Sequence, residues 1–282
     1  MPSAPPGLDA AQAALLGRWL PAYEVVDDMS WGVLETTVLR VETPGGPRVV
    51  KAGGPADHHL AREIRAHREW TGPWVAGGRA ARLIEADAEA KLLLTEYLPG
   101  WLVQDDPAAA DPATYEQAGA LLAAFHAQTS VVDDTFERRA NAKSLSWLEG
   151  PHRIVPDDVA RLRALIAGWP EPPAVCVPTH GDWQPRNWLI DDGTLRVIDF
   201  GRADLRPPLE DFERLDSGEF IGRPDLAAAF TSGYGSDPRR SPAWQRQRTR
   251  AGISAACWSF RFGVRELEQR GLRMIAEVLA GA

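Results

Sequence analysis

The stretch of sequence that most constrains the fold is a β-hairpin predicted in the second half of the chain. Two apolar runs, 188–190 and 195–198, flank the pair Asp192-Gly193, and such a pair is typical of a tight hairpin turn. In an antiparallel hairpin, residues equally far from the turn lie opposite each other, about 5 Å apart. Residues just before and just after this hairpin are therefore expected to meet at its open end.

Three oxygen-bearing side chains stand at that open end. Asn187 precedes the hairpin, Asp199 follows it, and Asp182 lies five residues before Asn187. Amide and carboxylate oxygens are ligands that Mg²⁺ prefers beside water and phosphate oxygens, so Asn187 and Asp199 are predicted to bind a metal. The short loop keeps the Asp182 carboxylate near the same place, where it could take a proton from a hydroxyl group. Each residue taken alone could equally be a cap or turn residue.

Composition is typical of a water-soluble globular protein. The chain has 282 residues, 25% of them charged, and a net charge of −8 that is spread evenly along it, which disfavours a nucleic-acid or membrane partner. No apolar run is long enough to span a bilayer, the N-terminus lacks a signal-peptide pattern, and the two cysteines have no metal-site spacing. We therefore expect a cytoplasmic protein, as a monomer or weak dimer.

The remaining pattern predicts a sheet-rich part followed by a larger helical part. The first part has a helix over 8–20, one main helix over 57–70, and strands over 33–42, 48–52, 81–86 and 91–97. Pro99-Gly100 interrupts this pattern, and helices are then predicted over 113–128, 157–167 and 251–279. The boundary between the two parts is expected between residues 98 and 101, giving domains at 1–98 and 99–282.

The whole pattern from His180 to Gly201 resembles a known catalytic segment. It reads H-G-D-x-x-x-x-N, then strand, turn and strand, then D-F-G, and is similar to the catalytic and metal-binding segments of protein kinases. With glycine at its second position it most resembles the aminoglycoside phosphotransferase family and related small-molecule kinases. The resemblance, which covers about 33–214, implies an α+β, bilobal protein-kinase-like fold with a small β-rich N-lobe and a larger, mostly helical C-lobe.

The resemblance also implies cofactors and roles for particular residues. ATP and Mg²⁺ would be the cofactors, with Asp182 as the catalytic base and Asn187 and Asp199 as the metal ligands. Lys51, one of three lysines in the chain, ends a predicted strand and would contact the phosphates of the nucleotide. Glu63, on the next predicted helix, would hold that lysine.

A nucleotide-binding hinge is implied at 92–100. There the carbonyl group of Glu96 and the N–H group of Leu98 would bind adenine, and Thr95 would face the rear of its pocket. A core strand that ends in a turn would give the same sequence. His126, His180 and Asp211 are expected to be structural, Asp211 by bracing the catalytic loop from below.

Two segments depart from the protein-kinase pattern. Residues 30–36 stand where a glycine-rich loop would cover the phosphates, yet they contain one glycine, so phosphate contacts by Trp31, Gly32 and Val33 stay open. After Gly201 the chain runs almost directly into Leu209, without the long activation segment of a protein kinase. This second departure argues against a protein substrate.

The expected activity is ATP-dependent phosphorylation of a hydroxyl group on a small molecule. A cationic antibiotic, of the aminoglycoside or cyclic peptide type, fits both the resemblance and the acidity, and its modification would give resistance. Residues that could line its site, although a solvated helix face or core packing is their commoner role, are Glu210, Asp211, Glu213, Asp216, Glu219, Trp101, Trp147, Trp183, Trp244 and Trp258. The alternatives are a metabolic kinase of a sugar, choline or homoserine and, less favoured because all the motif positions are filled, a nucleotide-binding pseudokinase.

Overall fold

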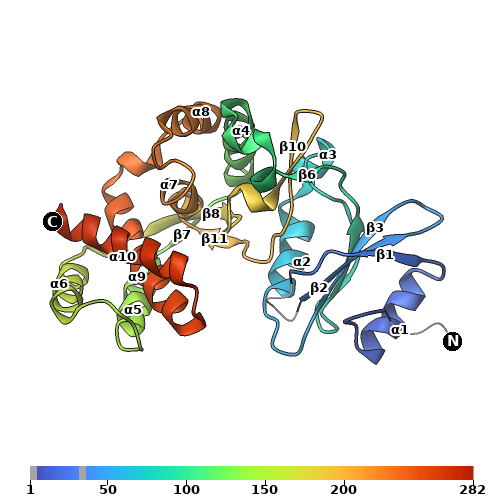
Figure 1. Ribbon diagram of the computed structural model, residues 1–282, viewed down its shortest axis with the longest axis horizontal. Helices are drawn as coiled ribbons and strands as arrows, with labels where there is room; N and C mark the ends of the chain where they lie inside the picture. The colour runs from blue at the N-terminus through green and yellow to red at the C-terminus, as the bar shows by residue number, and fades with distance from the viewer. Residues whose placement is uncertain (1–4, 32–35, 282) are drawn as a thin grey trace.

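A five-stranded antiparallel sheet forms the N-terminal part of the protein (Figure 1). The structure is a computed structural model and describes residues 5–31 and 36–281. The strand order is β1-β2-β3-β5-β4. The strands are β1 (Glu24–Asp28), β2 (Thr36–Glu42), β3 (Arg48–Gly53), β4 (Leu83–Asp87) and β5 (Leu92–Glu96). The small β-rich lobe expected from the sequence is therefore present.

Helices lie against both faces of this sheet. On one face α1 (Ala10–Trp19) packs Leu16 into a cluster with Val50 of β3 and Leu94 of β5. On the other face α2 (Leu60–Glu69) packs Ile64 against Leu93. Because side chains alternate along a strand, Lys51 faces the α2 side, opposite to Val50. A short helix, α3 (Gly72–Ala76), follows α2.

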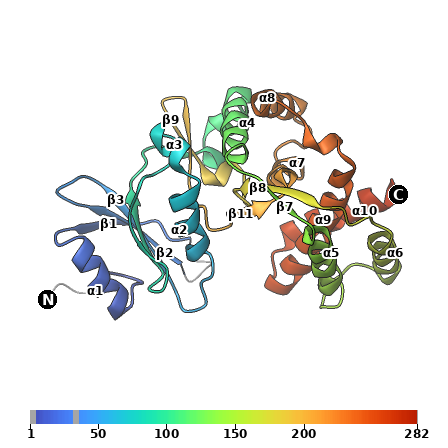
Figure 2. The same ribbon diagram turned by 180° about the vertical axis from the view of Figure 1, so that it is seen from behind.

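The rest of the chain forms a larger, mostly helical part (Figures 1 and 2). Its helices are α4 (Pro112–His126), α5 (Phe136–Trp147), α6 (Pro156–Ala167), α7 (Glu213–Asp216), α8 (Pro224–Tyr234), α9 (Pro242–Phe262) and α10 (Arg265–Ala280). Two three-stranded sheets, ordered β10-β9-β6 and β11-β8-β7, accompany them. Their strands are β6 (Trp101–Leu102), β7 (Val131–Asp133), β8 (Ala174–Thr179), β9 (Trp188–Asp191), β10 (Thr194–Val197) and β11 (Asp204–Arg206).

The predicted hairpin is β9 and β10. Asp191 pairs with Thr194 at the turn, and Asp192 and Gly193 have φ of 46° and 68°, as a two-residue type I′ turn requires. At the open end the N–H of Ile198 donates to the carbonyl of Asn187 at 3.0 Å. Asn187 therefore lies opposite the residue before Asp199, as the hairpin argument expects.

The largest buried cluster lies around this hairpin and is rich in aromatic rings. Trp183 and Trp188 are fully buried in it. Trp74 of α3 stacks on Phe125 of α4 with ring centroids 4.4 Å apart, and lies 5.7 Å from the ring of Trp183. Trp183 is thus a core residue, and the cluster joins the end of the N-terminal part to the segment that carries Asp182.

Element boundaries differ from the sequence-based expectation in several places. The strand expected over 33–42 is described only from Thr36, since 33–35 lie outside the described residues. The helix expected over 251–279 is two helices, because Gly263 adopts φ 72° between α9 and α10. Strand β8 was missed because Pro178 normally argues against a strand. In the described part of the chain, no helix has both the length and the apolarity to cross a membrane.

Gly119 of α4 and Gly233 of α8 allow these two helices to pack closely, and this gives a test of the packing. A methyl carbon on Gly119 would lie 2.1 Å from the carbonyl oxygen of Phe230. We expect Gly119→Ala to lower the free energy of unfolding by about 1–3 kcal/mol, as overpacking does, measured by urea denaturation. Gly17→Ala in α1 is the matched control. Nothing lies within 4 Å of its added carbon, so it should raise stability by about 0.5–1 kcal/mol. Equal effects would contradict the packing argument.

Candidate active site

A buried carboxylate holds the loop that carries Asp182. Asp211, at the end of the short helix η4 (Pro208–Asp211), accepts hydrogen bonds from the backbone N–H groups of His180 at 2.8 Å and Gly181 at 2.6 Å. His126 Nε2 lies 3.0 Å from the same carboxylate. Burial alone would raise the pKa of Asp211, but His126 and these donors lower it. Asp211 is therefore a charged brace beneath the loop.

Gly181 is required where the loop turns. Its φ is 77°, and a carbon added at its Cα would lie 2.4 Å from the backbone carbonyl oxygen of Arg202. A side chain here would both strain the backbone and push Arg202 away. The glycine of the H-G-D pattern thus lets the loop lie directly against the segment that follows Asp199.

The structure brings Asp182, Asn187 and Asp199 together at the open end of the hairpin. Asn187 ends the short helix η3 (Pro185–Asn187), and its Nδ2 donates to the carbonyl of Asp182 at 2.7 Å. Because an amide has one donor and one acceptor end, this leaves Oδ1 of Asn187 as the atom free to bind a cation. Asp182 and Asn187 are 3% and 4% exposed, whereas the Asp199 side chain is 51% exposed.

A lysine of the N-terminal sheet lies beside Asp199. Lys51 Nζ donates to Glu63 Oε1 at 2.6 Å and lies 3.6 Å from Asp199 Oδ1. Burial alone would lower the pKa of Lys51, but Glu63 and Asp199 outweigh it and raise that pKa. Lys51 is therefore a fixed cation beside the Asp199 carboxylate, and the lysine–glutamate pair has the geometry implied by the resemblance.

Contacts from α2 to the Asp-Phe-Gly segment were not predicted from the sequence. His59 Nδ1 lies 3.0 Å from the carbonyl oxygen of Gly201, and Arg65 pairs with Asp204 at 2.7 Å. The His67 ring packs edge-on against Phe200 at 5.1 Å, and burial lowers the pKa of His67 to about 3, which keeps the ring neutral. These contacts fix the helix that carries Glu63 against the segment that follows Asp199.

Arginines that sequence reasoning missed surround Asp182. Arg186 donates to Oδ2 at 2.5 Å, and Arg214 of α7 lies 3.1 Å from Oδ1. Gln184 also donates to Oδ1, at 2.6 Å. Burial alone would raise the pKa of Asp182, but Arg214, Arg186 and Arg202 outweigh it and lower the pKa to about 2. The four-residue spacing of Asp182 and Arg186 was a signal in the sequence; nothing local marked Arg214.

The predicted hinge follows β5, whose Leu93 pairs with Lys51 on β3. The N–H of Glu96 donates to the carbonyl of Arg82 at 3.0 Å, and its carboxylate pairs with the Arg82 guanidinium at 2.6 Å. The Leu98 N–H has no backbone partner among the described residues. Thr95 is buried on β5. The backbone donor expected to meet adenine is therefore available.

The predicted phosphate-covering loop is described only at its ends. Gly32 and Val33 lie outside the described residues. Trp31 is 60% exposed, and its ring centroid lies 5.9 Å from the guanidinium carbon of Arg186. The start of this loop therefore lies over the segment between Asp182 and Asn187.

Some of the carboxylates considered for a cationic acceptor form ion pairs with arginines or brace a loop, and others have no ion pair among the described residues. Asp216 pairs with Arg239 at 3.1 Å and also lies 3.6 Å from Arg248. Asp211 is the loop brace described above, and Glu210 lies 3.6 Å from Arg206. Carboxylates without an ion pair among the described residues are Glu213 and Glu219.

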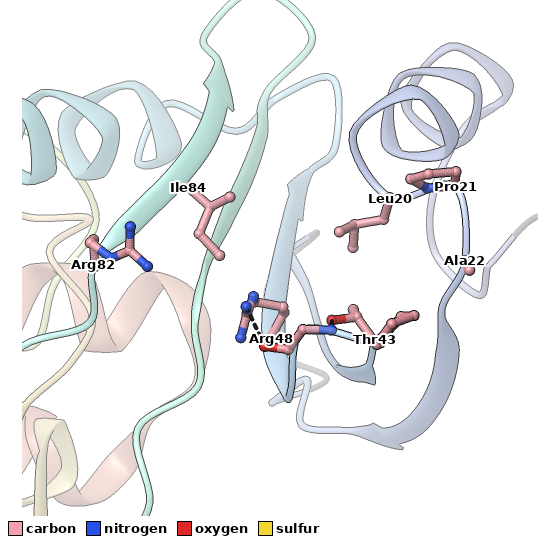
Figure 3. A pocket seen from close by; sticks show the side chains of 9 residues that line it. Leu20, Pro21, Ala22, Thr43, Arg48, Arg82 and Ile84 are labelled. Carbon is pink, nitrogen blue, oxygen red and sulfur yellow. Dashed lines mark hydrogen bonds between the residues drawn. The ribbon is translucent and has the colours of Figure 1, made fainter.

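A small apolar pocket lies elsewhere and contains none of the predicted site residues (Figure 3). It is formed where α1 ends, at the β2–β3 turn and on β4, and its lining includes Leu20, Pro44, Arg48 and Ile84. Arg48 shares a face of β3 with Val50, and Lys51 points to the other face. Across the described ranges no group of three or more His, Cys, Asp and Glu side chains has metal-binding geometry.

The fold is protein-kinase-like, and a family model identifies the chain as a phosphotransferase. Residues 25–246 match the model of the phosphotransferase enzyme family (APH). The chain belongs to that family and is a small-molecule phosphotransferase. No curated protein sequence gives a significant match.

Solved structures share the fold at low sequence identity. A thermostable mutant of aminoglycoside phosphotransferase APH(4)-Ia, in ternary complex with AMP-PNP and hygromycin B, is 16% identical with a TM-score of 0.72, over 96% of this chain and 98% of that one. The macrolide 2'-phosphotransferase MphH from Brachybacterium faecium is 17% identical, TM-score 0.60, over 96% and 98% of the chains. Choline kinase LicA from Streptococcus pneumoniae is 13% identical, TM-score 0.64, over 97% and 100%.

Glu210 gives a pH-dependent test of this region. Burial raises the pKa of Glu210 to about 7, although Arg206 opposes the shift. The folded protein then binds more protons than the unfolded chain between the ordinary pKa and about 7, so stability should fall as pH rises through that window. Glu210→Gln should remove the loss, raising the free energy of unfolding by about 1–3 kcal/mol at pH 8 and hardly at pH 4.

Urea denaturation at the two pH values measures this difference. Glu149→Gln, at an exposed position, is the control and should change stability equally little at both. A stabilisation by Glu210→Gln that is as large at pH 4 as at pH 8 would contradict the assignment of the raised pKa.

Proposed function

We propose that this phosphotransferase moves the γ-phosphoryl group of ATP to a hydroxyl group of a small molecule. The observation that carries the proposal is the convergence of Lys51, Asn187 and Asp199 on one place beside Asp182. Lys51 lies 3.6 Å from Asp199, and Asn187 is hydrogen-bonded to the backbone of Asp182. A fixed cation, two hard oxygen ligands and a carboxylate base are the groups that phosphoryl transfer needs.

In the proposed reaction the acceptor hydroxyl oxygen attacks the γ-phosphorus of ATP. The bond from that phosphorus to the β–γ bridging oxygen breaks, ADP leaves, and the hydroxyl proton passes to Asp182. Asn187 Oδ1 and the Asp199 carboxylate would hold Mg²⁺, a set that suits an ion bound through few protein ligands plus phosphate oxygens. The ion would neutralise charge on the phosphates. Positioning then supplies most of the rate, because the transition state is loose.

The nucleotide would lie between the two parts of the chain. Lys51, held by Glu63 at 2.6 Å, would contact the α- and β-phosphates. The carbonyl of Glu96 and the N–H of Leu98 would meet adenine. On this basis we assign nucleotide binding to residues 1–98, and the catalytic loop and acceptor binding to residues 99–282.

Two acceptor classes follow from the sequence. A cationic antibiotic is supported by the structural neighbour that was solved with hygromycin B; modification of such a compound in the cytoplasm would give resistance. A metabolic hydroxyl compound is supported by the choline kinase neighbour. ADP release that depends on the acceptor, measured over a panel of antibiotics and hydroxylated metabolites, tests the proposed activity. ADP release that no compound accelerates would favour a nucleotide-binding pseudokinase.

Substitution of the proposed base separates chemistry from binding. Asp182→Ala should lower acceptor-dependent turnover by about 10²–10⁴-fold, the usual contribution of a positioned base, and leave nucleotide affinity unchanged. Asp199→Ala should lower turnover and also weaken Mg²⁺-dependent nucleotide binding. Both are measured by coupled ADP release and by titration with a fluorescent nucleotide. Wild-type turnover in either folded variant would contradict the roles.

Lys51→Met should raise the KM for ATP and lower kcat. The reason is that it removes the only lysine found beside Asp199 among the described residues. Lys143→Met is the matched control, because Lys143 is exposed on α5. It should leave both constants unchanged. Identical kinetics for the two variants would remove Lys51 from the proposed phosphate site.

A further inference from the structure

The Asp182 carboxylate lies in a cluster of three guanidinium groups that come from different segments. Arg186 lies on η3, Arg202 directly follows the Asp-Phe-Gly segment, and Arg214 lies on α7. Arg186 and Arg214 contact opposite oxygens of Asp182, at 2.5 and 3.1 Å. We call Arg186, Arg202 and Arg214 the arginine cluster.

This cluster carries more positive charge than Asp182 can neutralise. Asp182 and Asp199 are the carboxylates that act on the cluster, so three guanidinium groups face two carboxylates and one positive charge is in excess. Within the described residues the Arg202 guanidinium has neither an ion pair nor a hydrogen bond, although burial lowers its pKa. Its nitrogen atoms are not among the buried polar atoms left without a partner, so solvent reaches them and an anionic ligand could bind there.

The carboxylates in the next layer form no ion pair with the arginine cluster among the described residues. Glu213 and Glu219 are the acids of this layer, and neither forms an ion pair among the described residues. Burial raises the pKa of both residues, and the positive charges of Arg214 and Arg270 act to lower it. With Asp199 and this layer counted, four arginines face four carboxylates, but the guanidinium groups of Arg186 and Arg214 are the ones in contact with the proposed base.

The contacts with Arg186, Arg214 and Gln184 also crowd the carboxylate oxygens that Asp182 must use as a base. Oδ1 of Asp182 is engaged by Gln184 at 2.6 Å and by Arg214, and Oδ2 by Arg186. An acceptor hydroxyl must come within hydrogen-bond reach of one of these oxygens. Each carboxylate oxygen has two lone pairs, so Oδ2 keeps one free, whereas a hydroxyl group reaches Oδ1 only in exchange for the contact with Arg214 or Gln184.

We propose that the acceptor carries an anionic group, a carboxylate or a phosphate, next to the hydroxyl that is phosphorylated, and that the arginine cluster binds it. Arg214 would turn from Asp182 to this group, which Arg202 would also bind, and Oδ1 of Asp182 would become free for the hydroxyl. An ammonium group in the same position would meet three like charges. The inference rests on the proposed function and favours an anionic acceptor over the cationic one expected from the sequence.

The γ-phosphate of ATP is the other anion that could satisfy these arginines. Arg186 is the member that best suits it, because its guanidinium lies under the Trp31 ring, at the start of the predicted phosphate-covering loop. Arg214 comes from α7, in the acceptor part of the chain, and its substitution therefore separates the two possibilities.

Sulfate is the probe for the anion site, with the nucleotide site filled beforehand. The protein is saturated with AMP-PNP and Mg²⁺, which fill the γ-phosphate position, and sulfate is titrated against chloride at constant ionic strength while thermal stability is followed. We expect a saturable rise in Tm. Arg214→Gln and Arg202→Gln should each weaken sulfate binding by about tenfold, as loss of a charge-assisted hydrogen bond does. Arg138→Gln, exposed on α5, should not.

A second variant makes the test independent of damage to the fold. Asp182→Asn removes the carboxylate that now competes for the cluster, so sulfate should bind this variant more tightly than the wild type. Arg214→Lys keeps the charge and should restore part of the affinity that Arg214→Gln loses. A purely structural role for these residues would produce neither the gain nor the rescue.

Three outcomes would overturn the inference. Sulfate binding that disappears when AMP-PNP is bound would assign the cluster to the γ-phosphate. Sulfate affinity that neither Arg202→Gln nor Arg214→Gln changes would show an adventitious ion only. Phosphorylation of a polycationic acceptor that is undiminished in Arg214→Gln would exclude an anionic acceptor while leaving the proposed phosphotransferase activity intact. Failure of that activity is seen separately, as absence of stabilisation by AMP-PNP and Mg²⁺.

Discussion

The site depends on one buried carboxylate that holds the backbone of the loop bearing Asp182. Asp211 accepts hydrogen bonds from two successive backbone N–H groups, those of His180 and Gly181, and is itself 1% exposed. A buried charge is stable only when polar partners surround it, and His126 Nε2 supplies another at 3.0 Å. The loop therefore enters the hairpin from one fixed position, and the register of β9 and β10 then places Asn187 beside Asp199.

Short sequence patterns predicted the part of this arrangement that neighbouring residues determine, namely the hairpin. The turn pair Asp192-Gly193 predicted the hairpin and, to within one residue, which residues meet at its open end; the structure then gives the register. The pairing of Lys51 with Glu63 is different, because spacing alone could not bring them together. It was expected from a resemblance, and the structure places their charged atoms 2.6 Å apart.

Other features depend on contacts between distant segments and left no local signal. Arg214 reaches Asp182 from α7, and His59 reaches Gly201 across 142 positions of sequence. Strand β1, with the sequence EVVDD, has no clear alternation of apolar and polar residues, and most of its residues are exposed. It is held by pairing with β2. Tertiary pairing of this kind overrides local propensity.

The arginine cluster shows why overall charge is a poor guide to the acceptor. The chain has a net charge of −8, and that acidity favoured a cationic compound. Several of the acids that suggested such a site are used otherwise: Asp211 holds a loop, and Asp216 pairs with Arg239 and Arg248. Screening also limits the influence of distant surface charges to about 8–10 Å. The groups that an acceptor meets at Asp182 are then set by its direct neighbours, and these are guanidinium groups.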